Sequence, residues 1–153
     1  MKGLRWVVVL MMIMAMATVS DSQQVNRTAT ILDSEGGVSI LFSDGSDVPA
    51  EIGMTVSVGD EIITKNDSFA LVRIEGRETA TVEISANSRV IMSELMSNEA
   101  DNSQSTLLDL AMGKVLIKAD KLHSEKSKFE VKTPTSVVGV RGTTFEVQVE
   151  GIE

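Results

Sequence analysis

Near its end the sequence reads Phe129-Glu-Val-Lys-Thr-Pro-Thr-Ser-Val-Val-Gly-Val-Arg-Gly-Thr-Thr-Phe-Glu-Val-Gln-Val149, and this stretch decides the fold. Apolar residues alternate with polar ones in 129–131 and in 145–149, which predicts two strands that each turn one face toward a core. Pro134 has no N–H to give to a sheet, so the first strand should stop there. Gly139 and Gly142 predict a bulge, a positive φ or a close backbone approach.

Arg141 is the only formally charged residue between Lys132 and Glu146. We expect its guanidinium to be held inside the fold, where its five N–H donors cap the turn by bonding backbone carbonyls or an acid. On this interpretation the motif forms the fold and does not bind a ligand. The motif residues are Thr133, Pro134, Gly139, Val140, Arg141, Gly142, Thr143 and Phe145.

Short apolar runs separated by Gly, Asn or Asp turns also fill the rest of the chain. They predict about ten strands at the spacing of an all-β domain, and no long amphipathic helix occurs. Asp44-Gly45 between alternating runs predicts a hairpin. The segment 106–112 fits a helix or a strand, and pairing through Gly113 with 114–118 favours a second hairpin. The pattern leaves a compact β-sandwich, a short β-solenoid-like fold and a barrel-like fold open.

Composition restricts the function. The chain has 153 residues, of which 42% are hydrophobic, enough for one domain with a real core. It has no Cys, which excludes disulfides and a thiol nucleophile. With one His and no Cys, a zinc site would need several carboxylates, so none is expected. That residue, His123, lies in a charged segment, and no Gly-x-Ser-x-Gly elbow occurs. We therefore predict a protein that is not an enzyme and uses no cofactor.

Residues 1–20 read as an export signal. Lys2 and Arg5 precede an apolar run over 6–16, and cleavage is expected near Ala17 or Ser20, which leaves a domain over 25–153. The alternative is an uncleaved membrane anchor. Cleavage after Ala17 removes two of the 14 basic residues and none of the 22 acids, which gives a net charge of −10. A periplasmic or secreted protein of this charge is a poor partner for nucleic acid and suits proteins or cell-envelope components.

Acidic residues gather at hairpin tips. Asp44 and Asp47 are weak candidates for Ca²⁺ ligands, because carboxylate oxygens suit that ion. Their spacing does not match a calcium loop, and the interpretation that we favour is that these tips keep the protein soluble. Carboxylate pairs would also permit a hydrolase or a lyase that acts on an envelope glycan, which stays a third functional alternative.

The C-terminal motif resembles the hallmark of the FecR-type domain, a Thr-Pro followed by Val-Arg-Gly-Thr-x-Phe. Here it reads Thr133-Pro134 and then Val140-Arg141-Gly142-Thr143-Thr144-Phe145. The resemblance extends over about 31–149 and implies an all-β extracytoplasmic domain. In the best-known members this domain is the periplasmic part of an anti-sigma regulator, which senses a TonB-dependent transporter. No anti-sigma segment precedes the hydrophobic run here, so we expect the module without direct sigma-factor control.

Three functions follow, in order of preference. The first is an exported, non-catalytic module that binds a protein or a cell-envelope component. The second is a sensory domain of an iron-uptake-like signalling system, and the third is the carboxylate-dependent enzyme. If the strand over 145–149 forms an edge of the sheet, it is also a place for pairing with another chain.

Overall fold

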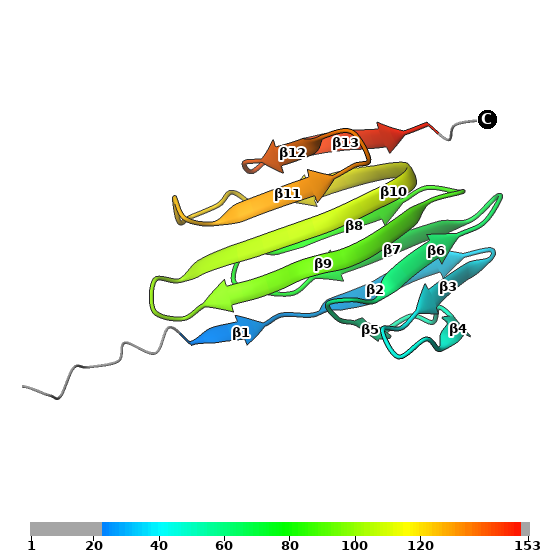
Figure 1. Cartoon of the computed structure of the whole chain (residues 1–153), viewed down its shortest axis with the longest axis horizontal. Helices are drawn as coiled ribbons and strands as arrows, with labels where there is room; N and C mark the ends of the chain where they lie inside the picture. Colours follow the sequence, from blue (N-terminus) through cyan, green and yellow to red (C-terminus); the bar gives the residue numbers. More distant parts are fainter. Residues whose placement is uncertain (1–22, 151–153) are drawn as a thin grey trace, which may run out of the picture.

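The computed structural model describes residues 23–150, which form one curled sheet of 13 strands shaped like half of a barrel (Figure 1). The predicted all-β single domain is confirmed, with more strands than expected. The predicted export signal lies outside the described residues. The first strands are β1 (Gln24–Asn26), β2 (Ala29–Glu35), β3 (Val38–Leu41), β4 (Asp47–Pro49), β5 (Thr55–Val56), β6 (Glu61–Thr64) and β7 (Phe69–Ile74). The others are β8 (Ala80–Ile84), β9 (Arg89–Asn98), β10 (Ser103–Ala119), β11 (Lys128–Lys132), β12 (Val137–Val140) and β13 (Thr144–Val149).

The long strand β10 joins the two layers of the curl. Its first half pairs with β9 and, in parallel, with β11, whereas its second half pairs with β8 and β13. Figure 1 shows β10 running along the near layer and then folding back behind it. Across both layers, neighbouring strands follow the order β4-β3-β6-β9-β10-β8-β7-β2-β5, and β1 pairs with β9 beside this path.

Gly113 bends this strand and does not end it, so the predicted hairpin over 106–118 is wrong. The register shifts between Leu110 and Met112, which is a β-bulge, and Gly113 follows with a φ of +95°. A Cβ on Gly113 would lie 2.1 Å from Ser88 Oγ, so only glycine fits against Ser88, the residue just before β9. Because the strand passes from one layer to the other at this bend, its two halves pair with different strands and not with each other.

Alternating side chains fill the space between the layers. On β8, for example, Ala80, Val82 and Ile84 are buried while the residues between them are partly exposed. The largest fully buried side chains are Ile31, Ile40, Ile62, Ile74, Ile84, Met92, Leu95, Leu108, Leu110 and Ile117. Each stabilises the fold by about 1.5–3 kcal/mol relative to an exposed position, which makes this core the main source of stability.

Candidate functional site

The turn that opens the motif is closed by its own threonine. The Thr133 backbone N–H donates to the Ser136 carbonyl at 2.8 Å, and the Ser136 N–H donates to Thr133 Oγ1 at 3.0 Å. Pro134 lies inside this turn, between β11 and β12. The expectation that the strand stops at Pro134 is confirmed.

Three further motif residues serve the fold. Val140 is buried and Phe145 packs against the core. Gly142 has a φ of +60°, and a Cβ there would lie 2.8 Å from the Lys121 backbone, which confirms a close approach at this glycine. Beyond Gly142 the chain passes through Thr143, which is exposed, and then pairs β13 with the second half of β10.

Arg141 is exposed, so the expectation of an internal guanidinium is wrong. Within residues 23–150 it forms no side-chain hydrogen bond and no ion pair. The reason lies in the period of the strand: Val138 faces the groove described below and Val140 faces the core, which turns Val137, Gly139 and Arg141 to the opposite face.

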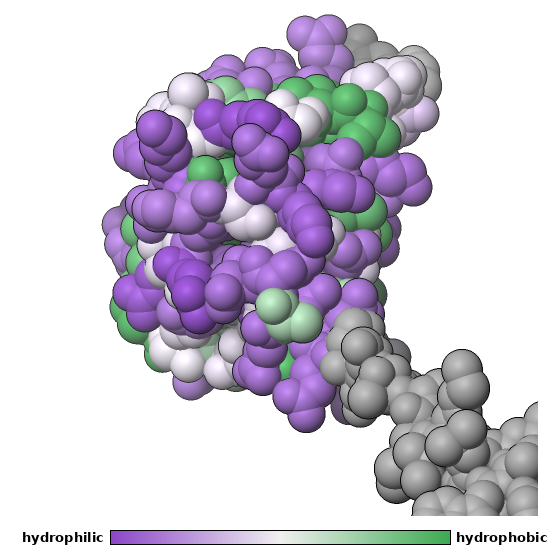
Figure 2. Space-filling model, turned by 90° about the vertical axis from the view of Figure 1, so that its left-hand side faces the viewer, coloured by the Kyte–Doolittle hydropathy of each residue, from purple (hydrophilic) through white to green (hydrophobic). Residues whose placement is uncertain are grey.

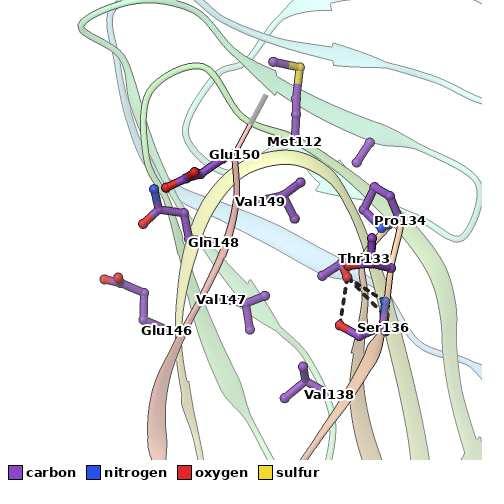
Figure 3. A pocket seen from close by; sticks show the side chains of 12 residues that line it. Met112, Thr133, Pro134, Ser136, Val138, Glu146, Val147, Gln148, Val149 and Glu150 are labelled. Atoms are coloured by element: carbon purple, nitrogen blue, oxygen red, sulfur yellow. Dashed lines mark hydrogen bonds between the residues drawn. The ribbon is translucent and has the colours of Figure 1, made fainter. Parts of the chain in front are cut away.

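The motif borders a large groove of about 750 Å³. One wall is the turn from Thr133 to Ser136 with Val138, and the other is β13 with Glu150. Figure 3 shows Val147 and Val149 extending from β13 toward the turn, whereas Glu146, Gln148 and Glu150 point away. Ala111 and Met112, at the bend of β10, complete the lining. The groove is therefore mainly apolar, with polar residues at its rim.

The polar groups of this groove belong to its turn and to its rim. The hydroxyls of Thr133 and Ser136 lie 3.0 Å apart and close the turn, while the carboxylates of the lining, Glu146 and Glu150, point away from it (Figure 3). His123 lies in another part of the molecule, where its Nδ1 is 3.7 Å from Glu78 Oε1. A concave apolar surface with a few polar groups suits binding better than chemistry.

The weak calcium candidates lie at an exposed turn. Asp44 Oδ1 accepts hydrogen bonds from the Ser46 hydroxyl at 2.6 Å and from the Ser46 N–H at 2.8 Å. These bonds hold the pKa of Asp44 below its usual value. Asp47 is also exposed, as the first residue of β4. In the described part of the chain, no group of three or more His, Asp or Glu residues is placed to hold a metal ion.

The sequence interpretation missed a buried arginine at the opposite end of the core. Arg27 donates to Thr106 Oγ1 at 2.6 Å and to the carbonyls of Ser105, Met96 and Glu75 at 2.8, 3.1 and 3.2 Å. Burial lowers the pKa of Arg27, while the charges of Glu78 and Glu94 oppose that shift.

The neighbouring acid, Glu78, is buried too. Its Oε1 accepts the His123 backbone N–H, and its Oε2 has no hydrogen-bond partner in residues 23–150. The signal for both residues was present in the sequence: Arg27 continues the inward series of Ala29 and Ile31, and Glu78 continues that of Ala80. The surface over this end of the molecule is mostly hydrophilic (Figure 2).

Comparison with known families matches residues 60–152 to the family described as FecR protein. The match starts just before β6, runs through β13 and includes the whole motif. No curated protein and no solved structure matches the chain significantly. Over residues 23–150, the structure has no helix with the length and hydropathy needed to cross a membrane. Because the family match covers more than half of the chain, the chain belongs to the FecR family.

Proposed function

We propose that this chain is an exported, non-catalytic module that binds a protein or a cell-envelope component in the groove between the Thr133–Ser136 turn and β13. The observation that carries the proposal is the groove itself, about 750 Å³ in volume, mainly apolar and placed at the family motif. FecR proteins are a regulatory and signalling family without enzymatic activity, which agrees with a binding role.

The strands on both sides of the groove support this location. Among the described strands, β12 pairs only with β11 and β13 pairs only with β10. Each therefore keeps one edge whose N–H and C=O groups are free for another chain. The edge over 145–149 is one of these two places for partner binding.

A sensory role is the second candidate, because the FecR domain occurs in surface-signalling regulators of the iron-uptake type. On this view the partner is a transporter or a regulator of the same system. Genes for a sigma factor, an anti-sigma protein or an outer-membrane transporter next to this one would favour it. A neighbourhood with none of these genes would leave the general binding module.

Photo-crosslinking tests the groove directly. A photoreactive phenylalanine analogue replaces Met112, which is exposed at the groove, or Ile52, which is exposed on a distant loop as the matched control. We expect a specific adduct in the cell envelope from position 112 and none from position 52. The substitution Val149→Glu should abolish that adduct without lowering the amount of folded protein. Equal adducts from both positions, or none from either, would contradict the proposal.

A further inference from the structure

The outer edge of β12 is open to another strand. Because the Thr133 N–H bonds the Ser136 carbonyl at 2.8 Å, the hydrogen-bonded pairs alternate from this turn. Val138 and Val140 therefore bond β11, while the backbone groups of Val137 and Gly139 point away from it. Val137 is 58% exposed, so this edge is both unpaired and uncovered in the part that the structure describes.

Gly139 lies at this edge although the fold does not require glycine there. Its φ is not positive, and a Cβ would meet no atom within 4 Å. Glycine inside a strand weakens it by roughly 0.5–1 kcal/mol relative to alanine. A strand glycine without a bulge or a tight contact marks a place where another chain comes close.

Two cations lie beside this glycine without carboxylate partners. The register of β11 and β12 ends at the pair Phe129 and Val140, and Lys128 and Arg141 are the next residues along the two chains. Like charges at neighbouring positions repel each other. Within residues 23–150 neither forms an ion pair, and Glu130, opposite Gly139, forms none with them.

The two cations and the glycine share one hollow. Lys128, Gly139 and Arg141 line a cavity of about 450 Å³ together with residues 125–127 and Glu130. Lys126 in this lining is already paired with Asp101 at 3.1 Å. Glu125 and Glu130 hold no cation in the described residues, so Lys128 and Arg141 are left for an external carboxylate.

The charge of the whole domain directs acidic ligands to this end. Residues 23–112 contain 5 basic and 15 acidic side chains, whereas residues 113–150 contain 7 basic and 5 acidic ones. An acidic segment is repelled by the first region and attracted by the second. Only the C-terminal strands combine a surplus of cations with a free strand edge.

We infer that an extended acidic segment of a partner protein adds to β12 as an antiparallel strand. Its residues i, i+2 and i+4 then lie opposite Arg141, Gly139 and Val137, with Cβ atoms about 4.5–5.5 Å away where both residues have one. A carboxylate at i pairs with Arg141 and Lys128, and a large aromatic side chain at i+2 covers the bare backbone of Gly139. A β-branched residue at i+4 packs beside Val137. This inference rests on the proposed function, because it names the kind of segment that the module binds.

Fluorescence anisotropy with a labelled peptide tests the pattern. The probe is Thr-Glu-Thr-Phe-Thr-Val-Thr, titrated with protein produced from the full-length chain. Its controls are the same peptide with Gln in place of Glu and the peptide of reversed sequence. We expect the Glu probe to bind about tenfold more tightly than either control, which corresponds to one charged contact of about 1.4 kcal/mol. Equal binding of the three peptides would overturn the inference.

Variants of the protein assign the contacts. Arg141→Gln should bind the Glu and Gln probes equally, whereas the control Arg73→Gln, which removes an exposed cation on β7, should keep the difference. Gly139→Val should weaken the Phe probe about tenfold and leave a probe with Ala in place of Phe unchanged. Unchanged melting temperatures show that these variants fold. An Arg141→Gln protein that still prefers the Glu probe would contradict the assigned pairing.

Amide hydrogen exchange separates strand addition from general attraction of anions. The N–H groups of Val137 and Gly139 should exchange more slowly when the Glu probe is bound. Long-chain polyphosphate is the comparison, and binding of this polymer as tight as that of the Glu probe, without slower exchange, would overturn the inference. If the adduct at position 112 forms but no peptide binds, the proposed function stands and only this inference fails.

Discussion

Arg27 and Arg141 are the same residue type in opposite situations. Arg27 is 8% exposed and uses its guanidinium to bond Thr106 Oγ1 and three backbone carbonyls from different parts of the chain. Arg141 is exposed and bonds nothing in residues 23–150. The arginine that the fold depends on is outside the motif, and the arginine inside the motif is left free.

Two glycines repeat this contrast. Gly113 has a φ of +95° and lies so close to Ser88, just before β9, that a Cβ would overlap this residue. Gly139 has neither a positive φ nor a neighbour within 4 Å of where a Cβ would lie. The first glycine lets β10 change layer, whereas the second serves no purpose in the isolated domain.

The comparison shows that one motif contains residues that the fold requires and residues that it does not require. Gly142 and Phe145 hold the last strand in place through a close backbone approach and a core contact. Gly139 and Arg141 lie on either side of buried Val140, at the end of β12 and just beyond it, and face outward. Measuring stability and binding in the same variants therefore separates the residues that form the fold from those that we propose to bind a partner.

The largest effect should come from Arg27→Met. Removing the guanidinium leaves three partly buried carbonyls and the buried Thr106 Oγ1 without this donor, and it removes the positive charge beside Glu78. We expect the free energy of unfolding to fall by about 3–5 kcal/mol, measured by urea denaturation. Arg73→Met is the matched control, since Arg73 is 44% exposed and pairs only with Glu75, and it should change stability by less than about 1 kcal/mol. Similar losses in both variants would remove the distinction between the two environments.

Gly113→Ala should follow with a loss of about 2–4 kcal/mol, from the strained φ and from overlap with Ser88. Thermal or urea unfolding of the purified protein measures it. Ser88→Ala in the same chain should not restore stability, because the new Cβ also lies 2.4 Å from the Ser88 Cα, which every residue has. Full stability of Gly113→Ala would show that β10 does not bend at this residue.

Much of this fold could be predicted because strands have a period of two. Alternation at Ala80, Val82 and Ile84 assigns an inner face, and the same rule applied to Arg27 and Glu78 would have placed both inside. The bend at Gly113 could not be predicted, because glycine suits a reversal and a bulge equally well. The period of two also applies to Arg141, but valines occupy both faces of β12, so the sequence does not show which face turns toward the core.

Asp101, before β10, forms an ion pair with Lys126, which lies beside Arg141 in the hollow. Removing this pair should change stability less than the two substitutions above. Its carboxylate accepts bonds from the Ser103 hydroxyl at 2.6 Å and N–H at 3.1 Å and from Lys126 at 3.1 Å, and these bonds lower the pKa of Asp101 from 3.8. A lowered pKa in the folded state means that the stabilisation is complete above about pH 4 and disappears as the pH falls through the lower value. Asp101→Asn should therefore have a lower urea midpoint than the parent at pH 7, and the difference should shrink as the pH is lowered below about 4. A difference that stays constant as the pH falls would contradict an ionic origin.

The smallest effects should come from the two free motif residues. Arg141→Ala removes no side-chain hydrogen bond or ion pair formed within residues 23–150, so stability should stay within about 0.5 kcal/mol of the parent. Gly139→Ala should raise the free energy of unfolding by up to about 1 kcal/mol, because alanine loses less backbone freedom on folding and its Cβ meets open space. Urea denaturation measures the free energy of unfolding of both variants, in the same experiment as Arg27→Met and Gly113→Ala. A loss above about 2 kcal/mol in Arg141→Ala would mean that the guanidinium is bound inside the fold, and the motif would then be fold-forming throughout. No loss would leave the exposed arginine and glycine to be explained by what binds to them, because the isolated domain is equally stable without them.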